Sequence, residues 1–327
     1  MQVAVVGPDT MATNRSERTL ARLAVPFWNA SEGRVRALWR IVGALALTLV
    51  VPGIVFAATI QNLDLPLVVT GFASNALFAV TTLVVLVAWA RYVDRQPVAA
   101  YGFRVDRRWL AMLAAGAFVG IAGWGGALAT DLIAGWATIE AVVSGGERTL
   151  PFAVAFALGV AQFALVGLWE EVVFRGIVMR NAVEGLDFPG VSRRWALVGG
   201  WVGSSVLFGA LHYDQAGSVL ALGFWVLAGL VLGLAHLLTD ELAVPIGLHA
   251  AFDIGVNHVW GLAMAAPDER VAAIPMLLRP AFTGPERFVG VAGVVNTAWV
   301  LVMAVVVIAL VWRARGTLRP AFSFREE

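Results

Sequence analysis

The sequence contains no cysteine, and this absence removes several classes of functional site. Without a thiol the chain cannot build a disulfide framework, a thiolate zinc site or a cysteine nucleophile. Lysine is absent as well, so all 23 basic residues are arginine. A hydrolase built on this chain must therefore work by another route.

Charged residues are also scarce. They make up 14% of the 327 residues, against 60% for apolar residues, whereas a soluble domain has about 25% charged residues. The composition predicts an all-α fold, a polytopic transmembrane helical bundle in the lipid bilayer, and the length suffices for roughly eight spans of about 20 residues without a second domain. No P-loop, GxGxxG or nucleic-acid motif is present, and we expect no cofactor and no nucleic-acid partner.

The distribution of apolar segments divides the chain. Residues 1–36 are polar and interrupted by proline, which predicts a mobile N-terminal tail; residues 37–313 are expected to form the bundle, and residues 314–327 a C-terminal tail. Residues 261–290, which include Asp268-Glu269-Arg270, predict an external loop with a short interfacial helix. The expected spans are 38–60, 67–90, 109–135, 151–174, 195–212, 217–238, 241–260 and 291–312.

The arginines test this arrangement of spans. When the connections are assigned to alternate sides, eighteen arginines fall on one side and four on the other, and Arg175 lies within a motif. Cytoplasmic connections carry an excess of basic residues. Both termini are therefore predicted to be cytoplasmic, as an even number of spans requires, and the expected location is the bacterial cytoplasmic membrane.

Glycines recur at helical spacing in two of the expected spans. Gly199, Gly200 and Gly203 lie in the fifth span, and Gly229 and Gly233 in the sixth. Helices in lipid associate through close packing rather than through hydrophobic force. These glycines predict close contacts between helices.

Three polar clusters interrupt the apolar sequence: Glu170 to Arg175, Phe208 to His212, and His249 to Asp253. Each lies in or beside a segment long enough to span a bilayer. An ionisable group at that depth costs several kcal/mol unless it is paired, so such residues are functional candidates by default. Asp131 and Gln162, by contrast, are isolated in apolar segments, where we expect hydrogen bonding within the bundle.

The spacing of the first cluster predicts an internal ion pair. Residues four apart share a face of an α-helix, so Glu171 can pair with Arg175 while Glu170 points about 100° away. Two adjacent carboxylates near hydrocarbon repel each other and lose hydration, conditions that suit a general base near neutrality. The alternative is that both glutamates cap a helix end and pair with Arg175 and Arg180.

The other two clusters also use a spacing of four. Phe208 and His212 share one face, with an apolar ring beside the imidazole, although a single histidine at the end of a span is often an interfacial residue. His249 and Asp253 can hydrogen-bond to each other and point into one cavity. Structural pairing of these two side chains is the alternative.

The joint occurrence of Glu-Glu-x-x-x-Arg, Phe-x-x-x-His and His-x-x-x-Asp, each at a separate span, resembles the CPBP family of intramembrane glutamic proteases. This family includes the CAAX prenyl proteases of the Rce1 type and the bacterial Abi proteins. The resemblance covers about residues 150–258 and extends to the layout of eight spans. Each motif is short, but the three together are fairly specific.

The resemblance implies a metal-independent protease whose active site is sunk within the bundle. In that family pattern, Glu170 and His212 polarise the water that attacks a peptide bond, and His249 with the residue four later holds the oxyanion. Glu171, Arg175 and Phe208 would support the site. The implied partner is a peptide or protein substrate at the membrane, membrane-associated or prenylated-like; no oligomeric state is implied.

The chain departs from the family pattern at Asp253, where members commonly carry asparagine. An ionised aspartate accepts hydrogen bonds and cannot donate one. Asp253 can hold an oxyanion only when protonated; alternatively it orients His249, which we prefer, or Asn257, one turn further along the same face, donates instead.

The expected spans also conflict with a shared site. At about 1.5 Å per residue, a span ending at residue 174 places Glu170 near the cytoplasmic face. His212, at the far end of the next span, would then lie near the opposite face. The segment 175–195 re-enters the bilayer, the fifth helix is tilted, or the expected boundaries are wrong.

Two functions from other classes remain as alternatives. Glu170, His212, His249 and Asp253 form a plausible nitrogen and oxygen ligand set for a zinc-dependent membrane hydrolase, although the His-Glu-x-x-His helix motif is absent. A non-catalytic carrier or scaffold could use the same buried groups as a relay. The sequence shows no clear repeat between its halves of the kind often found in transporters.

Overall fold

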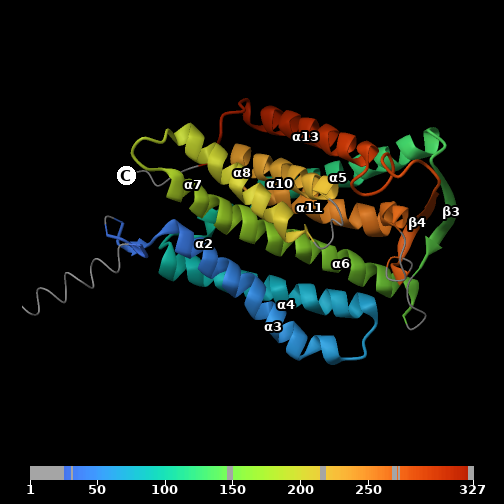
Figure 1. Cartoon of the computed structure of the whole chain (residues 1–327), viewed down its shortest axis with the longest axis horizontal. Helices are drawn as coiled ribbons and strands as arrows, with labels where there is room; N and C mark the ends of the chain where they lie inside the picture. Colours follow the sequence, from blue (N-terminus) through green and yellow to red (C-terminus); the bar gives the residue numbers. More distant parts are fainter. Residues whose placement is uncertain are drawn as a thin grey trace, which may run out of the picture.

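The computed structural model describes residues 26–30, 32–145, 150–213, 219–266, 271 and 273–322. Its long helices lie side by side (Figure 1). Most of the arginine-rich connections lie at one end of the bundle, and the sheet of β3 (Ala137–Ser144) and β4 (Met276–Phe282) lies at the other. We call these the arginine-rich end and the sheet end. The all-α polytopic bundle predicted from composition is confirmed.

The long helical segments follow the expected spans in number and order within the described residues. They are α2 Ala37–Leu45 with η1 Ala46–Val50 and α3 Val51–Ala58; α4 Leu67–Ala88 with η3 Trp89–Val93; α5 Arg107–Ile133; α6 Phe152–Glu171 with η5 Val172–Met179 and α7 Arg180–Leu186; α8 Arg193–Leu211; α10 Val219–Thr239; α11 Ala243–Ile254 with η6 Gly255–Val259; and α13 Val294–Arg315. Short 3₁₀ turns connect them at η2 Ile60–Asn62, η4 Val98–Tyr101 and η7 Leu262–Ala265.

Six of these segments are long and apolar enough to cross a membrane. The other two are α8, which begins with Arg193 and Arg194, and α11 with η6, which is short. Both lie within the bundle, because α8 packs on α10 and α11 packs on α5 and α6. The two helices that look least like spans in sequence thus carry the second and third motifs.

The fourth segment corrects one predicted boundary. The expected span ended at residue 174, but α6, η5 and α7 form one continuous helical segment to Leu186. α8 then returns against α7 and η5. Glu170 lies 16 residues before Leu186 and His212 lies 19 residues after Arg193, so both are roughly 24–28 Å from this hairpin connection. The conflict in depth therefore came from a wrong boundary.

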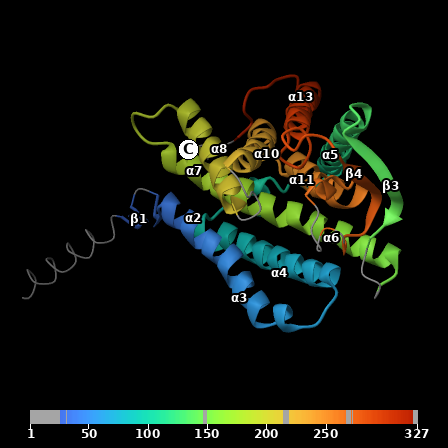
Figure 2. The same cartoon turned by 45° about the vertical axis from the view of Figure 1, so that its right-hand side comes forward.

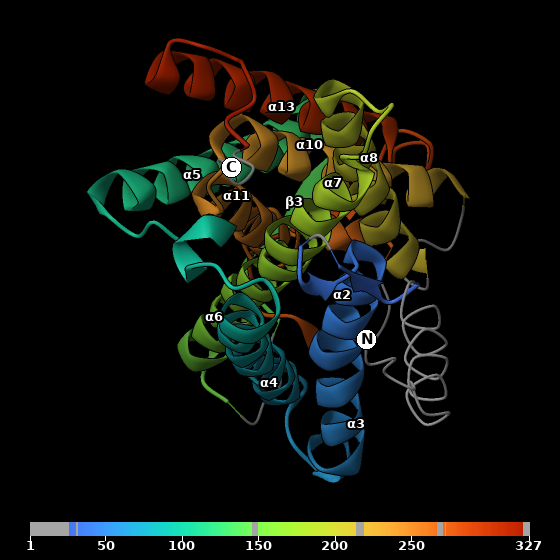
Figure 3. The same ribbon diagram turned by 90° about the vertical axis from the view of Figure 1, so that its left-hand side faces the viewer.

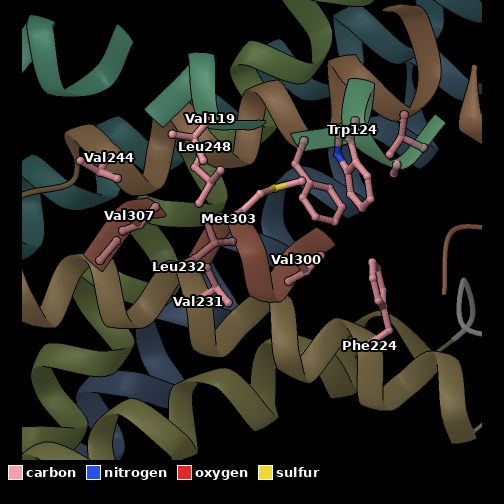
Figure 4. Packing of buried hydrophobic residues seen from close by; sticks show 14 of the residues in the cluster. Val119, Trp124, Phe224, Val231, Leu232, Val244, Leu248, Val300, Met303 and Val307 are labelled. Carbon is pink, nitrogen blue, oxygen red and sulfur yellow. The ribbon is translucent and has the colours of Figure 1, made fainter. Parts of the chain in front are cut away.

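The helices form two groups that meet at α6. α2, α3 and α4 lie on one side, and α5, α8, α10, α11 and α13 on the other (Figures 2 and 3). The largest apolar core lies in the second group, where Trp124, Leu248, Val231 and Met303 from α5, α11, α10 and α13 meet (Figure 4). α11 is enclosed, since every residue from 243 to 249 is buried. A helix this buried needs no lipid-facing surface, which explains why its sequence tolerates polar groups.

Glycines permit the closest helix contacts. A Cβ at Gly247 of α11 would overlap the backbone carbonyl of Leu113 in α5, and one at Gly200 of α8 would overlap Val183 in α7. Gly229 and Gly233 similarly face α8. Of the five glycines predicted to mark close contacts, Gly203 alone has open space around it.

The sheet end carries β3 Ala137–Ser144 and β4 Met276–Phe282, which pair antiparallel. β4 lies in the predicted external loop 261–290, together with the short turn η7, so this loop contains a strand that was not expected. The charged stretch 268–270 lies outside the described residues. The sheet ties the connection after α5 to the connection before α13.

Both predicted tails contain ordered parts. Near the N-terminus β1 Trp28–Asn29 pairs with β2 Arg34–Val35, while residues 1–25 lie outside the described residues. Residues 317–322, which we call the strap, fold back under the bundle: Ala321 N–H donates to the Leu237 carbonyl at 3.1 Å. Phe322 is buried against Arg180 and His236.

An ionic cluster closes the arginine-rich end beside α7. Arg40 in α2 lies 2.7 Å from Asp94 and 3.0 Å from Glu184 in α7, and Arg34 lies 3.0 Å from Glu184. Asp94 also accepts a hydrogen bond from the Tyr101 hydroxyl. Arg40 and Asp94 are almost fully buried. This cluster joins the N-terminal helices to the long segment that carries the first motif.

Candidate active site

The three polar clusters converge on one point within the bundle. Glu170 at the end of α6 faces His212 at the end of α8 and His249 in α11. Glu170 Oε2 lies 3.9 Å from His212 Nε2 and 3.8 Å from His249 Nε2. Glu170 is 8% exposed and His249 4% exposed. The predicted meeting of the acidic pair with both imidazoles is present in the structure.

The second glutamate orients one imidazole. Glu171 Oε1 lies 2.7 Å from Arg175 Nη1 and 2.7 Å from His249 Nδ1. The predicted pair of Glu171 and Arg175 is therefore present, and the same carboxylate oxygen accepts from His249 Nδ1–H. Because Nδ1 is engaged, the remaining nitrogen of His249, Nε2, is directed toward Glu170.

Arg175 is held from three directions. Besides Glu171, its guanidinium donates to the Gly229 carbonyl of α10 at 3.0 Å and lies 4.6 Å from the centre of the Phe208 ring. No part of Arg175 is exposed. Because Nη1 is paired with Glu171 and Nη2 is bonded to the backbone, this guanidinium is a fixed support for Glu171 rather than a mobile cation.

His212 is fixed by its own helix and by α10. Its Nδ1–H donates to the Phe208 carbonyl at 2.8 Å, so in the neutral ring Nε2 carries the lone pair that faces Glu170. Trp225 of α10 stacks on the imidazole, with ring centres 4.6 Å apart and planes 23° apart. Phe208 also contacts both imidazoles, at 4.5 Å from His212 and 5.7 Å from His249.

Asp253 lies on the Nε2 side of His249. Its Oδ2 is 3.7 Å from His249 Nε2, while the carboxylate on Nδ1 belongs to Glu171. The preferred orienting contact is thus made by Glu171 at 2.7 Å. The Asn257 amide donates to the Asp253 backbone carbonyl at 2.9 Å, which is a bond within its own helix.

The helix widens directly after Glu170 and Glu171. η5, residues Val172–Met179, is a π-helical stretch that begins directly after Glu171, and all its residues are buried. Such wide turns occur frequently at functional sites. Here the wide turn lies between the glutamates of α6 and Arg180 of α7, and Arg175 projects from it.

The distances around Glu170 suit a water that bridges it to the imidazoles from one side. Separations of 3.8 and 3.9 Å exceed direct hydrogen bonds, which need about 2.7–3.2 Å. A water between such groups satisfies them nearly as well as direct bonds do. Neither Glu170 Oε2 nor Glu171 Oε2 has a hydrogen-bond partner among the described residues. The arrangement can therefore polarise a water in an otherwise apolar setting.

Comparison with known families bears on this arrangement. A family model described as "Type II CAAX prenyl endopeptidase Rce1-like" matches residues 150–255. Residues 150–255 are Rce1-like. Neither the curated proteins nor the solved structures that were searched gave a match. The Rce1-like segment covers about a third of the chain: it runs from just before α6 to the end of α11 and holds all three motifs.

The match indicates a membrane-embedded peptidase of the CAAX type, as the motifs predicted. Within the described residues, no group of three or more histidine or carboxylate side chains is arranged to hold a metal ion. The four residues named as a zinc ligand set lie together in the Rce1-like segment, but without the spacing of metal ligands.

Sequence reasoning missed two contributors from α10. Trp225 stacks on His212, and the Gly229 carbonyl binds Arg175. Trp225 lies outside the three motifs within an expected span, and a backbone carbonyl leaves no sequence signal. Asp131 differs from its expectation in another way, since neither of its buried carboxylate oxygens has a hydrogen-bond partner among the described residues.

Proposed function

We propose that this CAAX-type endopeptidase is a metal-independent glutamic protease in which Glu170 and His212 activate water. The observation that carries the proposal is the position of Glu170 Oε2 between His212 Nε2 and His249 Nε2, at 3.9 and 3.8 Å. One carboxylate oxygen beside two imidazole nitrogens, across a gap that one water can bridge, is the arrangement that general-base hydrolysis needs. The substrate would be a membrane-associated or prenylated-like peptide.

In the proposed reaction Glu170 carries the proton from the attacking water to the departing amine. A water in the gap donates one hydrogen bond to Glu170 and one to the lone pair of His212 Nε2, which aims its oxygen at the scissile carbonyl carbon. As the carbon–oxygen bond forms, Glu170 takes the proton and the carbonyl oxygen becomes an oxyanion. Glu170 then returns this proton to the departing amine while the carbon–nitrogen bond breaks.

His249 supplies the oxyanion donor in this scheme. Carboxylates lie near both of its nitrogens, with Glu171 at 2.7 Å from Nδ1 and Asp253 at 3.7 Å from Nε2. They support an imidazolium that donates from Nδ1 to Glu171 and from Nε2 to the developing oxyanion. Such fixed donors often supply the largest single contribution to catalysis. We assign Asp253 to holding this imidazolium from the Nε2 side.

The test is the Glu170→Gln variant, which keeps the shape of the side chain and removes its basicity. Loss of a general base costs about 10²- to 10⁴-fold in rate. We expect mass spectrometry of membrane-peptide termini to find new termini with wild-type protein and none with Glu170→Gln. Asp131→Asn is the matched control, since it makes the same change at a buried carboxylate outside the site, and it should keep the wild-type termini.

Two further arms separate the alternatives. If Asp253 only holds the imidazolium, Asp253→Asn should retain cleavage within about tenfold, since an amide loses the charge but keeps the contact. Chelator-sensitive cleavage with stoichiometric zinc in the purified protein would favour the zinc hydrolase. Termini that are the same with wild type and Glu170→Gln would contradict the proposal and favour a carrier or scaffold.

A further inference from the structure

A pocket lies at the arginine-rich end, away from Glu170 and the two imidazoles. It has a volume of about 370 Å³ and is framed by the start of α5, the turn between α10 and α11, and the end of α13. Ala321 of the strap closes one side. None of the three motifs contributes a residue to its lining, so the pocket needs a different explanation.

The acidic residues in the pocket lining are already occupied. Glu241 Oε1 lies 2.6 Å from Arg104 Nε, and Asp240 lies 3.4 Å from both Arg104 and Arg180. Asp106 Oδ1 accepts the Trp109 N–H at 2.7 Å and so caps α5. These carboxylates are therefore engaged with this protein's own donors.

Two arginines in the same lining lack carboxylate partners within the part of the chain that the structure describes. Arg108 Nη2 lies 3.5 Å from the Ala314 carbonyl, a long contact, and Arg315 donates to the carbonyls of Leu238 and Arg319. Arg108 is exposed and Arg315 is half-buried. Their positive charge is thus available to a ligand in the pocket, from Arg108 on α5 and from Arg315 on α13.

The remaining walls are apolar. Trp109, Met112 and Val244 line the pocket toward the bundle, and Val311 lines it from α13. Leu110 and Trp312, which follow lining residues on α5 and α13, are exposed at 53% and 60%. A cationic mouth above apolar walls fits a molecule that carries a negative head on a hydrocarbon chain.

We propose that this pocket binds the phosphate headgroup of an anionic phospholipid, held by Arg108 and Arg315. Basic pockets between transmembrane helices bind such headgroups, and arginine recognises phosphate through paired N–H donors. The volume lies within the range of ligand sites, about 300–1,000 Å³. The lipid would join α5 to α13 and to the strap, independently of the chemistry at Glu170.

The test measures lipid binding by the full-length protein in detergent, by native mass spectrometry with added phosphatidylglycerol. Arg108→Gln with Arg315→Gln removes the proposed contacts. Arg107→Gln with Arg313→Gln is the matched control, since it removes the same charge from exposed arginines on the same helices that do not line the pocket. Loss of a charge-assisted hydrogen bond weakens binding about tenfold or more. We expect that loss in the pocket pair and less than about threefold in the control pair, where charges act only through screened distance.

Three results would overturn the proposal. Equal weakening in both pairs would indicate general surface charge, equal binding of phosphatidylcholine would exclude selection for an anionic lipid, and full competition by inorganic phosphate would identify a free anion as the ligand. Because Arg315 also supports the backbone of α10, the single variant Arg108→Gln is measured beside the pair. It should weaken phosphatidylglycerol binding while leaving the thermal unfolding of lipid-free protein unchanged.

Discussion

The groups around His212 and His249 determine which nitrogen of each ring faces Glu170. In each ring Nδ1 is engaged, by the Phe208 carbonyl for His212 and by Glu171 for His249, and Nε2 is left toward Glu170. The spacing of the motifs predicted which side chains meet, because residues four apart share a helix face. It could not predict the Nδ1 contacts, since one partner is a backbone carbonyl and the other lies 78 residues away.

Trp225 gives a residue-scale prediction. Its indole stacks on His212 and keeps Nε2 aimed at Glu170, so Trp225→Leu should lower kcat by up to about tenfold, the value of one aromatic pair. Trp225→Phe keeps a ring against the imidazole and should recover most of the rate. Steady-state kinetics on a peptide identified from the termini measures both variants. Equal losses in the two variants, or a change in KM alone, would show that Trp225 does not position His212.

Among the elements, α11 was expected as a span at 241–260, but its place inside the bundle could not be read from hydropathy. It is short and carries His249 and Asp253, yet it lies between α5 and α6, so tertiary packing rather than hydropathy places it in the bundle. The end of the fourth span was misplaced for a related reason. Arg175 and Arg180 were possible partners at a helix end, but both are buried and paired, and the helix continues past them.

The contact between α5 and α11 gives an element-scale prediction. A methyl group at Gly247 would overlap the Leu113 carbonyl, which is backbone and cannot rotate away. Gly247→Ala should therefore lower the free energy of unfolding by about 1–3 kcal/mol and, by moving His249, reduce kcat. Gly203→Ala, the control in α8, meets open space and should be neutral or slightly stabilising. Thermal unfolding in a fixed detergent compares them; equal stability of the two variants would contradict the packing argument.

At the scale of the whole molecule, composition and arginine distribution predicted a bundle with its basic connections gathered at one end. Periodicity gave no register between helices, so the pairing of β3 with β4, the return of the strap and the ionic cluster were not foreseeable. Each joins segments far apart in sequence, such as Arg40 with Glu184 across 144 residues. The orientation of the termini across the membrane stays a prediction.

The ionic cluster gives a prediction at this scale. Asp94→Asn leaves Arg40 with Glu184 as its acidic partner among the described residues, while Arg34 keeps Glu184 and Glu32. Breaking a buried pair costs about 3–5 kcal/mol of stability. Asp64→Asn makes the same change at an exposed position and should stay within about 0.5 kcal/mol of wild type. Thermal unfolding of the two variants under identical conditions checks this, and similar melting temperatures would refute it.

The same cluster predicts an alkaline effect. Burial and the neighbouring Asp94 carboxylate raise the pKa of the Tyr101 phenol, so the folded state favours the neutral form. The resulting contribution of Tyr101 to the free energy of unfolding is present at neutral pH. It is lost as the pH rises above about 10, the ordinary pKa of tyrosine. Asp94→Asn removes one of the two causes, so stability measured against pH should fall less steeply in the variant above that value.

The continuous segment from α6 through η5 to α7 has a consequence for changes in chain length. It holds Glu170 and Glu171 near its middle and Glu184 near its end. Deleting one residue from η5 would rotate everything beyond it by about 100°. The glutamates could then face the imidazoles only if Glu184 turned away from Arg34 and Arg40. The rotation of this one helical segment thus determines both whether the glutamates face the imidazoles and whether Glu184 pairs with its arginines. Insertions and deletions here should therefore be tolerated less than most substitutions.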